Sequence, residues 1–173
     1  MDIRKKRKDE HLRYTKKLRF EEKNGFEHYH LFNDSIPEIN YDSVCTKWSF
    51  LDRTIDYPIM INAITGGTWR GKRINKALAE LAAEFHIPMA VGSQKIALKD
   101  TKAIESFSIV RKVNRDGIVI GNLSAAASVN DVRAAIEMIE ADAIQLHLNV
   151  PQEICMNEGD RCFKGILDNI SEL

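Results

Sequence analysis

The chain has 173 residues, which suits one domain with a real core, and its 25 basic and 25 acidic residues balance. It has no apolar run near the ~18 residues that a membrane span needs, and its basic start has no apolar segment behind it, so neither a span nor a signal peptide is expected. The three cysteines have no Cys-x-x-Cys spacing, which argues against a disulfide framework or a zinc site. We therefore expect a soluble cytoplasmic protein.

Residues 1–57 are expected to form an N-terminal extension with a basic helix, a loop and a short hairpin around residues 47–55. The helix places Arg7 and His11 one turn apart, where cationic side chains could hold a diphosphate. A solvated basic face is the alternative. No interleaved aromatic residues support nucleic-acid binding.

Residues 58–173 alternate short apolar runs with amphipathic stretches. The expected strands are residues 58–64, 88–91, 117–120 and 143–148. Four helices are expected. The first has an apolar stripe at Ile74, Leu78, Leu81, Ala82 and Phe85, the second spans residues 102–112, and the fourth begins in residues 163–173. The third starts at a cap formed by Ser128 and Asp131 and has a stripe at Val132, Ala135, Ile136 and Ile139. This pattern predicts an α/β fold with a parallel sheet covered by helices.

Each expected strand is followed by small or polar residues. These clusters are Thr65-Gly66-Gly67, Gly92-Ser93-Gln94-Lys95, Gly121-Asn122, and Asn149 to Glu153. Ligands of parallel α/β folds lie at the carboxyl ends of the strands, so the four clusters together indicate a binding site. The glycines could let a ring or phosphate approach closely, or they could simply form tight turns.

The last strand alternates apolar residues with Gln145, His147 and Asn149, which share one face of it. Buried polar groups need partners, which a ligand or a self-satisfied polar layer could supply. After Pro151 ends the pairing, Glu153 could bind Mg²⁺ or could be an ordinary loop carboxylate.

Four strand–helix units make only half of a (β/α)8 barrel, which usually needs about 250 residues. The first and fourth strands would then be open edges, which proteins normally protect. Such edges would pair with another copy, or the chain would be half of something larger.

Several blocks resemble, in order and spacing, the type II isopentenyl-diphosphate isomerases. They are Arg7-Lys8-x-Glu10-His11, Ile36-Pro37-Glu38-Ile39-Asn40, residues 63–67, residues 91–94, residues 145–153 and Glu158-Gly159-Asp160-Arg161. The resemblance implies the N-terminal half of a (β/α)8 TIM barrel, with residues 58–173 as its first four units. It also implies a flavoprotein of isoprenoid biosynthesis that interconverts isopentenyl and dimethylallyl diphosphate by a 1,3-allylic proton shift. This isomerase needs reduced FMN, NADPH as reductant and Mg²⁺, has no nucleic-acid or membrane partner, and forms tetramers or octamers.

The resemblance also implies residue roles. Gln152 would orient the reacting carbons, and Glu153 would hold the metal. The residues implied at the cofactor are Ala63, Ile64, Thr65, Ser93 and Asn122. The residues implied at the substrate are Arg7, Lys8, His11, Ser93, Gln94, Lys95, His147, Asn149 and Gln152. Two positions depart from the family pattern, with Lys95 where Arg is common and Ile64 where Met is frequent.

Two other functions remain open at this point. One is a non-catalytic, truncated half-barrel that self-associates through its open edges, and weak or no activity is expected of the 173-residue chain alone. The other is a related FMN oxidoreductase barrel, which the strand-end glycines would also suit.

Overall fold

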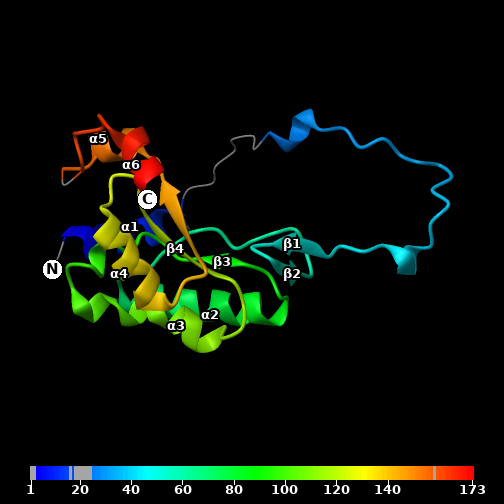
Figure 1. Ribbon diagram of the computed structural model, residues 1–173, viewed down its shortest axis with the longest axis horizontal. Helices are drawn as coiled ribbons and strands as arrows, with labels where there is room; N and C mark the ends of the chain where they lie inside the picture. The colour runs from blue at the N-terminus through cyan, green and yellow to red at the C-terminus, as the bar shows by residue number, and fades with distance from the viewer. Residues whose placement is uncertain (1–2, 16, 18–24, 158) are drawn as a thin grey trace.

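A computed structural model describes residues 3–15, 17, 25–157 and 159–173. Its centre is a parallel sheet in the order β3-β4-β5, formed by β3 (Met89–Ala90), β4 (Val119–Ser124) and β5 (Ala143–His147). The helices α2 (Trp69–Glu84), α3 (Glu105–Val113) and α4 (Val129–Ile139) form a layer on one side of the sheet, as Figure 1 shows. The expected mixed α/β fold with a parallel sheet is confirmed, and the described residues contain no closed barrel.

The middle strand β4 is longer than the sequence indicated. It continues past Ile120 to Ser124 and pairs with β5 from Ile120↔Ala143 to Ser124↔His147. The expectation that the strand ends at Ile120 and that Gly121-Asn122 follow it is therefore wrong, because these residues belong to the strand. Gly121 is required there by packing, since a Cβ would lie 2.8 Å from Ile144 Cδ1 and 2.9 Å from Gln94 Oε1.

The expected strand at residues 58–64 is also wrong, because only Ile61 forms a bridge, to Met89 of β3. The Ile61 N–H donates to Pro88 O at 2.9 Å, and its carbonyl accepts from Ala90 N at 2.8 Å. Ile59 and Ile64 are 61% and 58% exposed, so this segment is not the buried strand that its apolar residues indicated. It lies at an edge of the described sheet and pairs on one side, which leaves its other side without the support of a second strand.

Helix α2 forms where the sequence predicted a helix, but only part of its expected apolar stripe is buried. Thr68 caps it by accepting from Gly71 N at 3.0 Å. Its buried residues are Gly71, Asn75, Ala79 and Ala82. Leu81 and Phe85, which we expected in the apolar stripe, are 45% and 47% exposed. The small residues let α2 pack closely against α3, whose Phe107 and Val110 are fully buried.

The predicted start of α4 is confirmed in detail. The Ser128 hydroxyl accepts from Asp131 N at 3.2 Å, and the Asp131 carboxylate accepts from Ser128 N at 3.2 Å, which completes a capping box. The expected stripe is buried at Val132, Ala135 and Ile139 and partly buried at Ile136. The helix expected in residues 163–173 is α6 (Ile166–Glu172).

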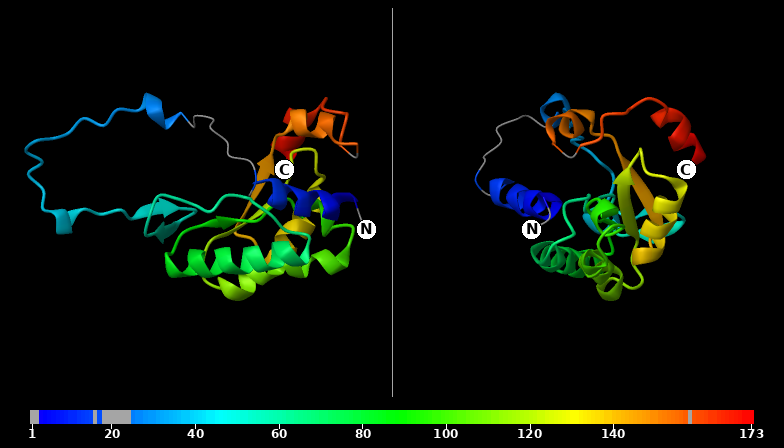
Figure 2. Two further views of the ribbon diagram at one scale, coloured as in Figure 1. Left: turned by 180° about the vertical axis from the view of Figure 1, so that it is seen from behind. Right: turned by 90° about the vertical axis from the view of Figure 1, so that its left-hand side faces the viewer.

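The N-terminal part contains the helix and hairpin that the sequence predicted. Helix α1 (Ile3–Thr15) lies against the main body, and the hairpin pairs β1 (Trp48–Phe50) with β2 (Arg53–Ile55). Figure 2 shows α1 beside the start of α2, where Thr68 Oγ1 donates to Asp9 Oδ1 at 3.2 Å. Residues 29–40 form a long connection that extends from the body and contains no helix or strand. The domain boundary at residues 57 and 58 remains a prediction.

Short helices complete the fold. They are the 3-10 helices η1 (Phe26–His28), η2 (Tyr41–Ser43), η3 (Gln94–Ile96) and η4 (Thr101–Ala103), and the α-helix α5 (Val150–Cys155). The sequence did not indicate α5, which has Pro151 in its first turn, where a missing N–H costs no helical hydrogen bond. In the part of the chain that the structure describes, no helix is both long enough and apolar enough to cross a bilayer.

Candidate functional site

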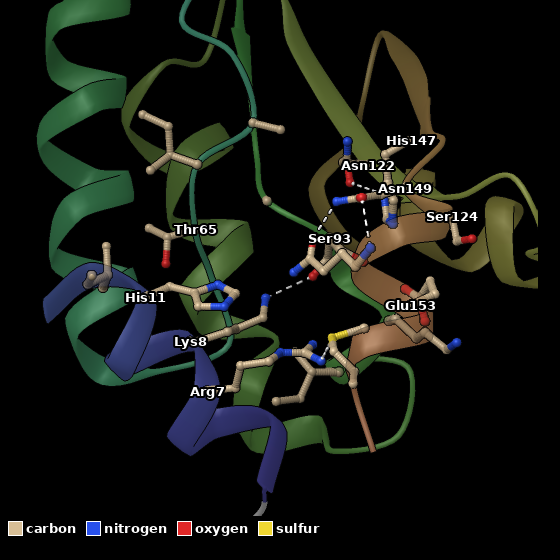
Figure 3. Close-up of a pocket in the computed structure, with 18 of the residues that line it drawn as sticks. Arg7, Lys8, His11, Thr65, Ser93, Asn122, Ser124, His147, Asn149 and Glu153 are labelled. Carbon is tan, nitrogen blue, oxygen red and sulfur yellow. Dashed lines mark hydrogen bonds between the residues drawn. The ribbon is translucent and has the colours of Figure 1, made fainter. Parts of the chain in front are cut away.

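One cavity of about 460 Å³ lies at the carboxyl ends of the strands, where the sequence predicted a site. Helix α1 forms one wall, residues 63–65 and the end of β3 form another, and β5 with α5 forms the third, as Figure 3 shows. Thr65, Ser93, Asn122 and Gln152 all line it. The cavity brings together these proposed site residues: Arg7, Lys8, His11, Ala63, Ile64, Thr65, Ser93, Lys95, Asn122, His147, Asn149, Gln152 and Glu153.

Polar side chains on β4 and β5 form a continuous hydrogen-bonded row. Asn122 Nδ2 donates to Gln145 Oε1 at 3.1 Å, and its Oδ1 lies 3.0 Å from His147 Nδ1. Gln145 Nε2 donates in turn to Asn62 Oδ1 at 3.1 Å. The row is therefore largely a self-satisfied polar layer, as one of the two interpretations of this strand expected. Its end at Asn122 and His147 still opens into the cavity.

The row contributes no net charge to the cavity wall. Burial is the main cause that lowers the pKa of His147; the Glu153 carboxylate opposes it, and the charges of Lys95 and Lys8 act in the same direction as burial. His147 is therefore neutral at physiological pH, and the wall consists of an uncharged imidazole and uncharged amides.

The cations at the site come from α1. Lys8 Nζ donates to the carbonyl oxygen of Ser93 at 3.0 Å and lies 5.2 Å from the centre of the Phe107 ring. Burial, with Arg7 beside it, lowers the pKa of Lys8 from 10.5 to about 8. This position contradicts the interpretation of α1 as a fully solvated basic face.

Arg7 and His11 lie beside Lys8 on the same wall. Arg7 contacts the sulfur of Met156, which follows α5, so it connects α1 with the opposite wall of the cavity. Burial is the main cause that lowers the pKa of His11, and Arg7 adds to it. The α1 wall of the cavity thus carries the guanidinium of Arg7, the ammonium of Lys8 and the imidazole of His11, a set that suits an anionic ligand.

Helix α1 is held in place by polar contacts at several points along its length. Lys5 forms an ion pair with Asp100, and Thr68 Oγ1 donates to Asp9 Oδ1 at 3.2 Å. These contacts tie the helix to the turn before η4 and to the cap of α2. They explain how a helix of mainly charged residues lies against the body without an apolar stripe.

Glu153, on the opposite wall, is the one carboxylate among the described residues that line the cavity. Glu153 Oε2 accepts from the Asp160 backbone N–H at 2.8 Å, and the Asp160 carboxylate pairs with Lys95 Nζ at 2.7 Å. Glu153 itself lines the cavity. The described residues contain no group of three or more His, Cys, Asp or Glu side chains that could hold a metal ion without other ligands.

No family model matches the chain. Among curated proteins, isopentenyl-diphosphate delta-isomerase of Listeria innocua is 44% identical over 97% of this chain and 47% of its own length. The protein of that name from Bacillus cytotoxicus is 43% identical over 98% of this chain and 49% of its own length. The one from Symbiobacterium thermophilum is 39% identical over the whole of this chain and 50% of its own length.

This chain is a homologue of isopentenyl-diphosphate delta-isomerases. The similarity covers nearly all of its residues, and the chain spans about half the length of the curated relatives it matches. The homology confirms the resemblance to isopentenyl-diphosphate isomerases that the sequence blocks indicated.

Gln94 is one proposed substrate residue of this homologue that does not line the cavity. Its side chain is fully buried, with Nε2 donating to Ala135 O at 2.8 Å and Oε1 accepting from Asn122 N at 3.0 Å. Both ends of the amide are occupied by protein groups, so Gln94 joins η3 to β4 and α4. The structure therefore corrects the expectation that Gln94 borders a ligand.

The glycines after residue 65 serve the turn and the packing. A Cβ on Gly66 would lie 2.0 Å from Phe107 Cε1, and Gly67 has φ +81° with Ile96 Cγ2 at 2.6 Å from its hypothetical Cβ. Both positions exclude a side chain because of neighbouring protein atoms. The tight-turn interpretation accounts for them without a ligand.

Helix α5 determines the positions of the Asn149 and Gln152 side chains. Asn149 Oδ1 caps this helix by accepting from Gln152 N at 3.3 Å, and the two side-chain amides are also hydrogen-bonded. Pro151 in the first turn starts the helix immediately after the strand, and this brings Gln152 and Glu153 over the cavity.

Sequence reasoning missed several residues that line the cavity, namely Leu12, Thr15, Ile96, Ser124, Leu148 and Met156. Ser124 was missed because β4 was expected to end at Ile120. Leu12 and Thr15 could have been found from the helical spacing, since they lie one turn beyond Lys8 and His11 on α1. Met156 gave no signal in the sequence. Glu158, part of one quoted block, lies outside the described residues.

Proposed function

We propose that this chain provides the diphosphate-binding half of an FMN-dependent, type II isopentenyl-diphosphate isomerase, built on a partial (β/α)8 barrel. The observation that carries the proposal is the composition of one cavity. It has cations on α1, an uncharged amide and imidazole wall on β4 and β5, and a carboxylate at Glu153. Homology to isopentenyl-diphosphate delta-isomerases over nearly the whole chain supports it.

The proposed substrate position follows from the charges. Arg7 can form paired hydrogen bonds with diphosphate oxygens, and Lys8 adds a point charge. A diphosphate near Lys8 would stabilise its ammonium form and offset the burial that lowers its pKa to about 8. The hydrocarbon end would then lie toward the neutral wall of Asn122 and His147.

The residues at the cavity can accommodate the flavin cofactor that the proposed reaction needs. The uncharged groups at Ala63–Thr65, Ser93 and Asn122, with the exposed apolar side chain of Ile64 beside them, fit a flat ring with hydrogen-bonding edges. Reduced FMN, maintained by NADPH, supplies the proton exchange at the substrate carbons when it is bound. The volume of about 460 Å³ is in the ordinary range of small-molecule sites.

Glu153 fits Mg²⁺ as one ligand of several. Mg²⁺ commonly takes one or two carboxylates and completes its shell with waters and substrate phosphates. Because Asp160 N–H already holds Glu153 Oε2, the carboxylate has a fixed orientation. Glu153 would share the ion with the diphosphate, which explains why no larger acidic cluster is needed.

The neutral wall has a chemical purpose in this proposal. An allylic proton shift develops positive charge on the substrate carbons, and a fixed carboxylate or amine nearby could trap or divert it. Asn122, His147 and Gln152 can orient the carbons through uncharged dipoles instead. Gln152, held beside Asn149 at the start of α5, is the residue proposed to orient the reacting carbons.

The test uses the 173-residue chain with isopentenyl diphosphate, FMN, NADPH and Mg²⁺, and detects dimethylallyl diphosphate. A parallel titration with inorganic pyrophosphate and Mg²⁺ measures binding without catalysis. The proposal expects saturable binding that Arg7→Gln weakens and the exposed-site control Lys99→Gln does not. Neither product nor Arg7-dependent binding would reject the proposal for this chain.

A self-associating half-barrel is supported by a separate observation. Among the described elements, β5 pairs only with β4, and the other edge carries exposed Ile59 and Ile64. Such edges favour pairing with another chain. Sedimentation at several concentrations measures this, and a monomer throughout would exclude self-association without affecting the pyrophosphate result.

A further inference from the structure

Residues 159–161, which follow α5, belong to a sequence block that the proposed reaction does not use, yet they fold back on the helix that carries Glu153. Gly159 N donates to Met156 O at 3.2 Å. A Cβ on Gly159 would lie 1.8 Å from the carbonyl oxygen of Glu153, so glycine is required for this close approach. Arg161 Nη2 also donates to Met156 O, at 3.0 Å, and the carboxyl end of α5 is thereby capped. These contacts give the loop a defined position against α5.

The backbone and the side chain of Asp160 in this loop have different partners. The backbone N–H donates to Glu153 Oε2 at 2.8 Å, and the carboxylate pairs with Lys95 Nζ at 2.7 Å. Lys95 lies in η3, which follows β3, so the ion pair joins the α5 wall of the cavity to the wall at the end of β3. Within the part of the chain that the structure describes, Glu153 Oε1 makes no hydrogen bond. That oxygen is left for a ligand.

The ion pair also decides which carboxylate faces the cavity. Glu153 and Lys95 line the cavity, whereas Asp160 does not. The ammonium of Lys95 neutralises the Asp160 carboxylate and holds it where it cannot compete with Glu153 for a cation. A single carboxylate is enough for Mg²⁺ when waters and substrate phosphates complete its shell.

We propose that Asp160 and Lys95 are positioning residues for the Glu153 carboxylate, an inference that rests on the proposed metal-binding role of Glu153. Lys95 anchors Asp160, and the Asp160 N–H holds Oε2 of Glu153 so that Oε1 faces an incoming divalent cation. This gives Lys95 a task besides the anion binding that the family resemblance implied. The sign of one effect tests it. Removal of the positive charge of Lys95 favours cation binding by Coulomb's law, whereas loss of positioning weakens it.

The first experiment measures the solvent exchange of the Asp160 backbone amide by NMR, without added metal. Lys95→Gln should raise the exchange rate by about two- to fivefold, the contribution expected of a partly exposed ion pair. Loss of the charge alone would attract less hydroxide and slow the exchange. Asp160→Asn keeps the backbone N–H but not the carboxylate charge, so it should show the same rise and serves as the second variant if Lys95→Gln does not fold.

The second experiment titrates the ¹⁵N-labelled chain with Mn²⁺, which takes the same oxygen ligands as Mg²⁺ and broadens the signals of nearby amides. We expect saturable broadening around Glu153. The half-saturating Mn²⁺ concentration should rise by about two- to fivefold in Lys95→Gln and return to the parent value in Lys95→Arg, which keeps the ion pair. Lys99→Gln removes the same charge from an exposed lysine outside the cavity and should change neither measurement.

The inference is overturned if Lys95→Gln leaves the Asp160 exchange rate unchanged or lowers it. It is also overturned if Lys95→Gln binds Mn²⁺ as tightly as the parent or more tightly, or if Lys95→Arg behaves as Lys95→Gln does. The expected exchange rates without any Mn²⁺ broadening around Glu153 would support the positioning and reject the metal-binding role in the proposed function. Isomerase activity enters neither experiment, so its absence is distinguishable from a failure of this inference.

Discussion

The Nδ1 nitrogen of His147 on β5 lies 3.0 Å from the side-chain oxygen of Asn122 on β4. Because Asn122 uses its amide nitrogen to donate to Gln145, its oxygen is the acceptor, and the neutral imidazole carries its proton on Nδ1. The Nε2 nitrogen then has a free lone pair. The two strands thus fix both the ring orientation and the tautomer of a residue that lines the cavity.

This arrangement predicts a pH dependence of stability. The folded-state pKa of His147 is lowered, mainly by burial, so the unfolded chain binds more protons in the window below the ordinary histidine pKa of 6.5. The stabilisation is present above pH 6.5 and is lost as the pH falls through the folded pKa. His147→Gln, which keeps a polar amide, should flatten the slope of unfolding free energy against pH in that window.

Urea denaturation of parent and variant at pH 7 and pH 5.5 measures the slope. His30→Gln, at an exposed position in the N-terminal loop, is the matched control and should keep the parent slope. Equal slopes for all three proteins would show that His147 does not carry the effect.

Lys8 predicts a second pH effect, with its own window. Its pKa is lowered from 10.5 to about 8, so the folded chain gains stability as the pH rises from about 8 to 10.5, where the unfolded chain still binds the proton. At ~1.4 kcal/mol for each pKa unit, the full effect is ~3 kcal/mol at most. Lys8→Met should be most favourable relative to the parent near pH 7, and this difference should shrink toward pH 10.5.

The same denaturation series with Lys6→Met supplies the control. Lys6 is an exposed neighbour on α1, so its substitution should change stability by a similar small amount at every pH. A difference between Lys8→Met and parent that stays constant from pH 7 to 10 contradicts the burial of this ammonium group.

Particular residues show how far the sequence could predict the structure. The start of α4 was predictable because Ser128 and Asp131 form their cap from local atoms alone. The polar residues of β5 were predictable as one face because strand side chains alternate. Their hydrogen-bond partners were not, because Asn62 and Asn122 reach Gln145 only through the tertiary arrangement of the strands.

The errors have the same physical origin. Residues 58–64 are as apolar as a buried strand, yet only Ile61 forms a bridge, and local composition does not report which partner strands are available. Gln94 was assigned to a ligand because the family resemblance implied it and because it lies in a polar cluster after an expected strand. Its burial depends on Ala135 and Asn122, which are 41 and 28 residues away in the sequence.

Gln94 therefore predicts a large effect on stability. Gln94→Ala leaves the carbonyl of Ala135 and the N–H of Asn122 buried without their partner, at roughly 1–3 kcal/mol for each group. We expect a loss of ~2–5 kcal/mol in unfolding free energy. The matched substitution Gln152→Ala, at an exposed glutamine on the cavity, should cost less than ~1 kcal/mol. Similar losses for both variants would contradict the structural position of Gln94.

The turn after Thr65 gives the last prediction. Gly66→Ala would place a methyl group 2.0 Å from Phe107 Cε1, and Phe107 is fully buried between α2, α3 and the sheet, so it has no room to move. Overpacking of this kind costs about 1–3 kcal/mol, and the positive φ of +156° adds strain. Gly165→Ala is the control, because Gly165 has φ +85° but no atom within 4 Å of its hypothetical Cβ, so it should lose only ~1 kcal/mol. Thermal melting of both variants separates the loss of stability caused by the contact with Phe107 from the loss caused by backbone strain alone. A Gly66→Ala variant no less stable than Gly165→Ala would mean that Phe107 does not pack against this turn, and the cation–π contact between Lys8 and the Phe107 ring would lose its support as well.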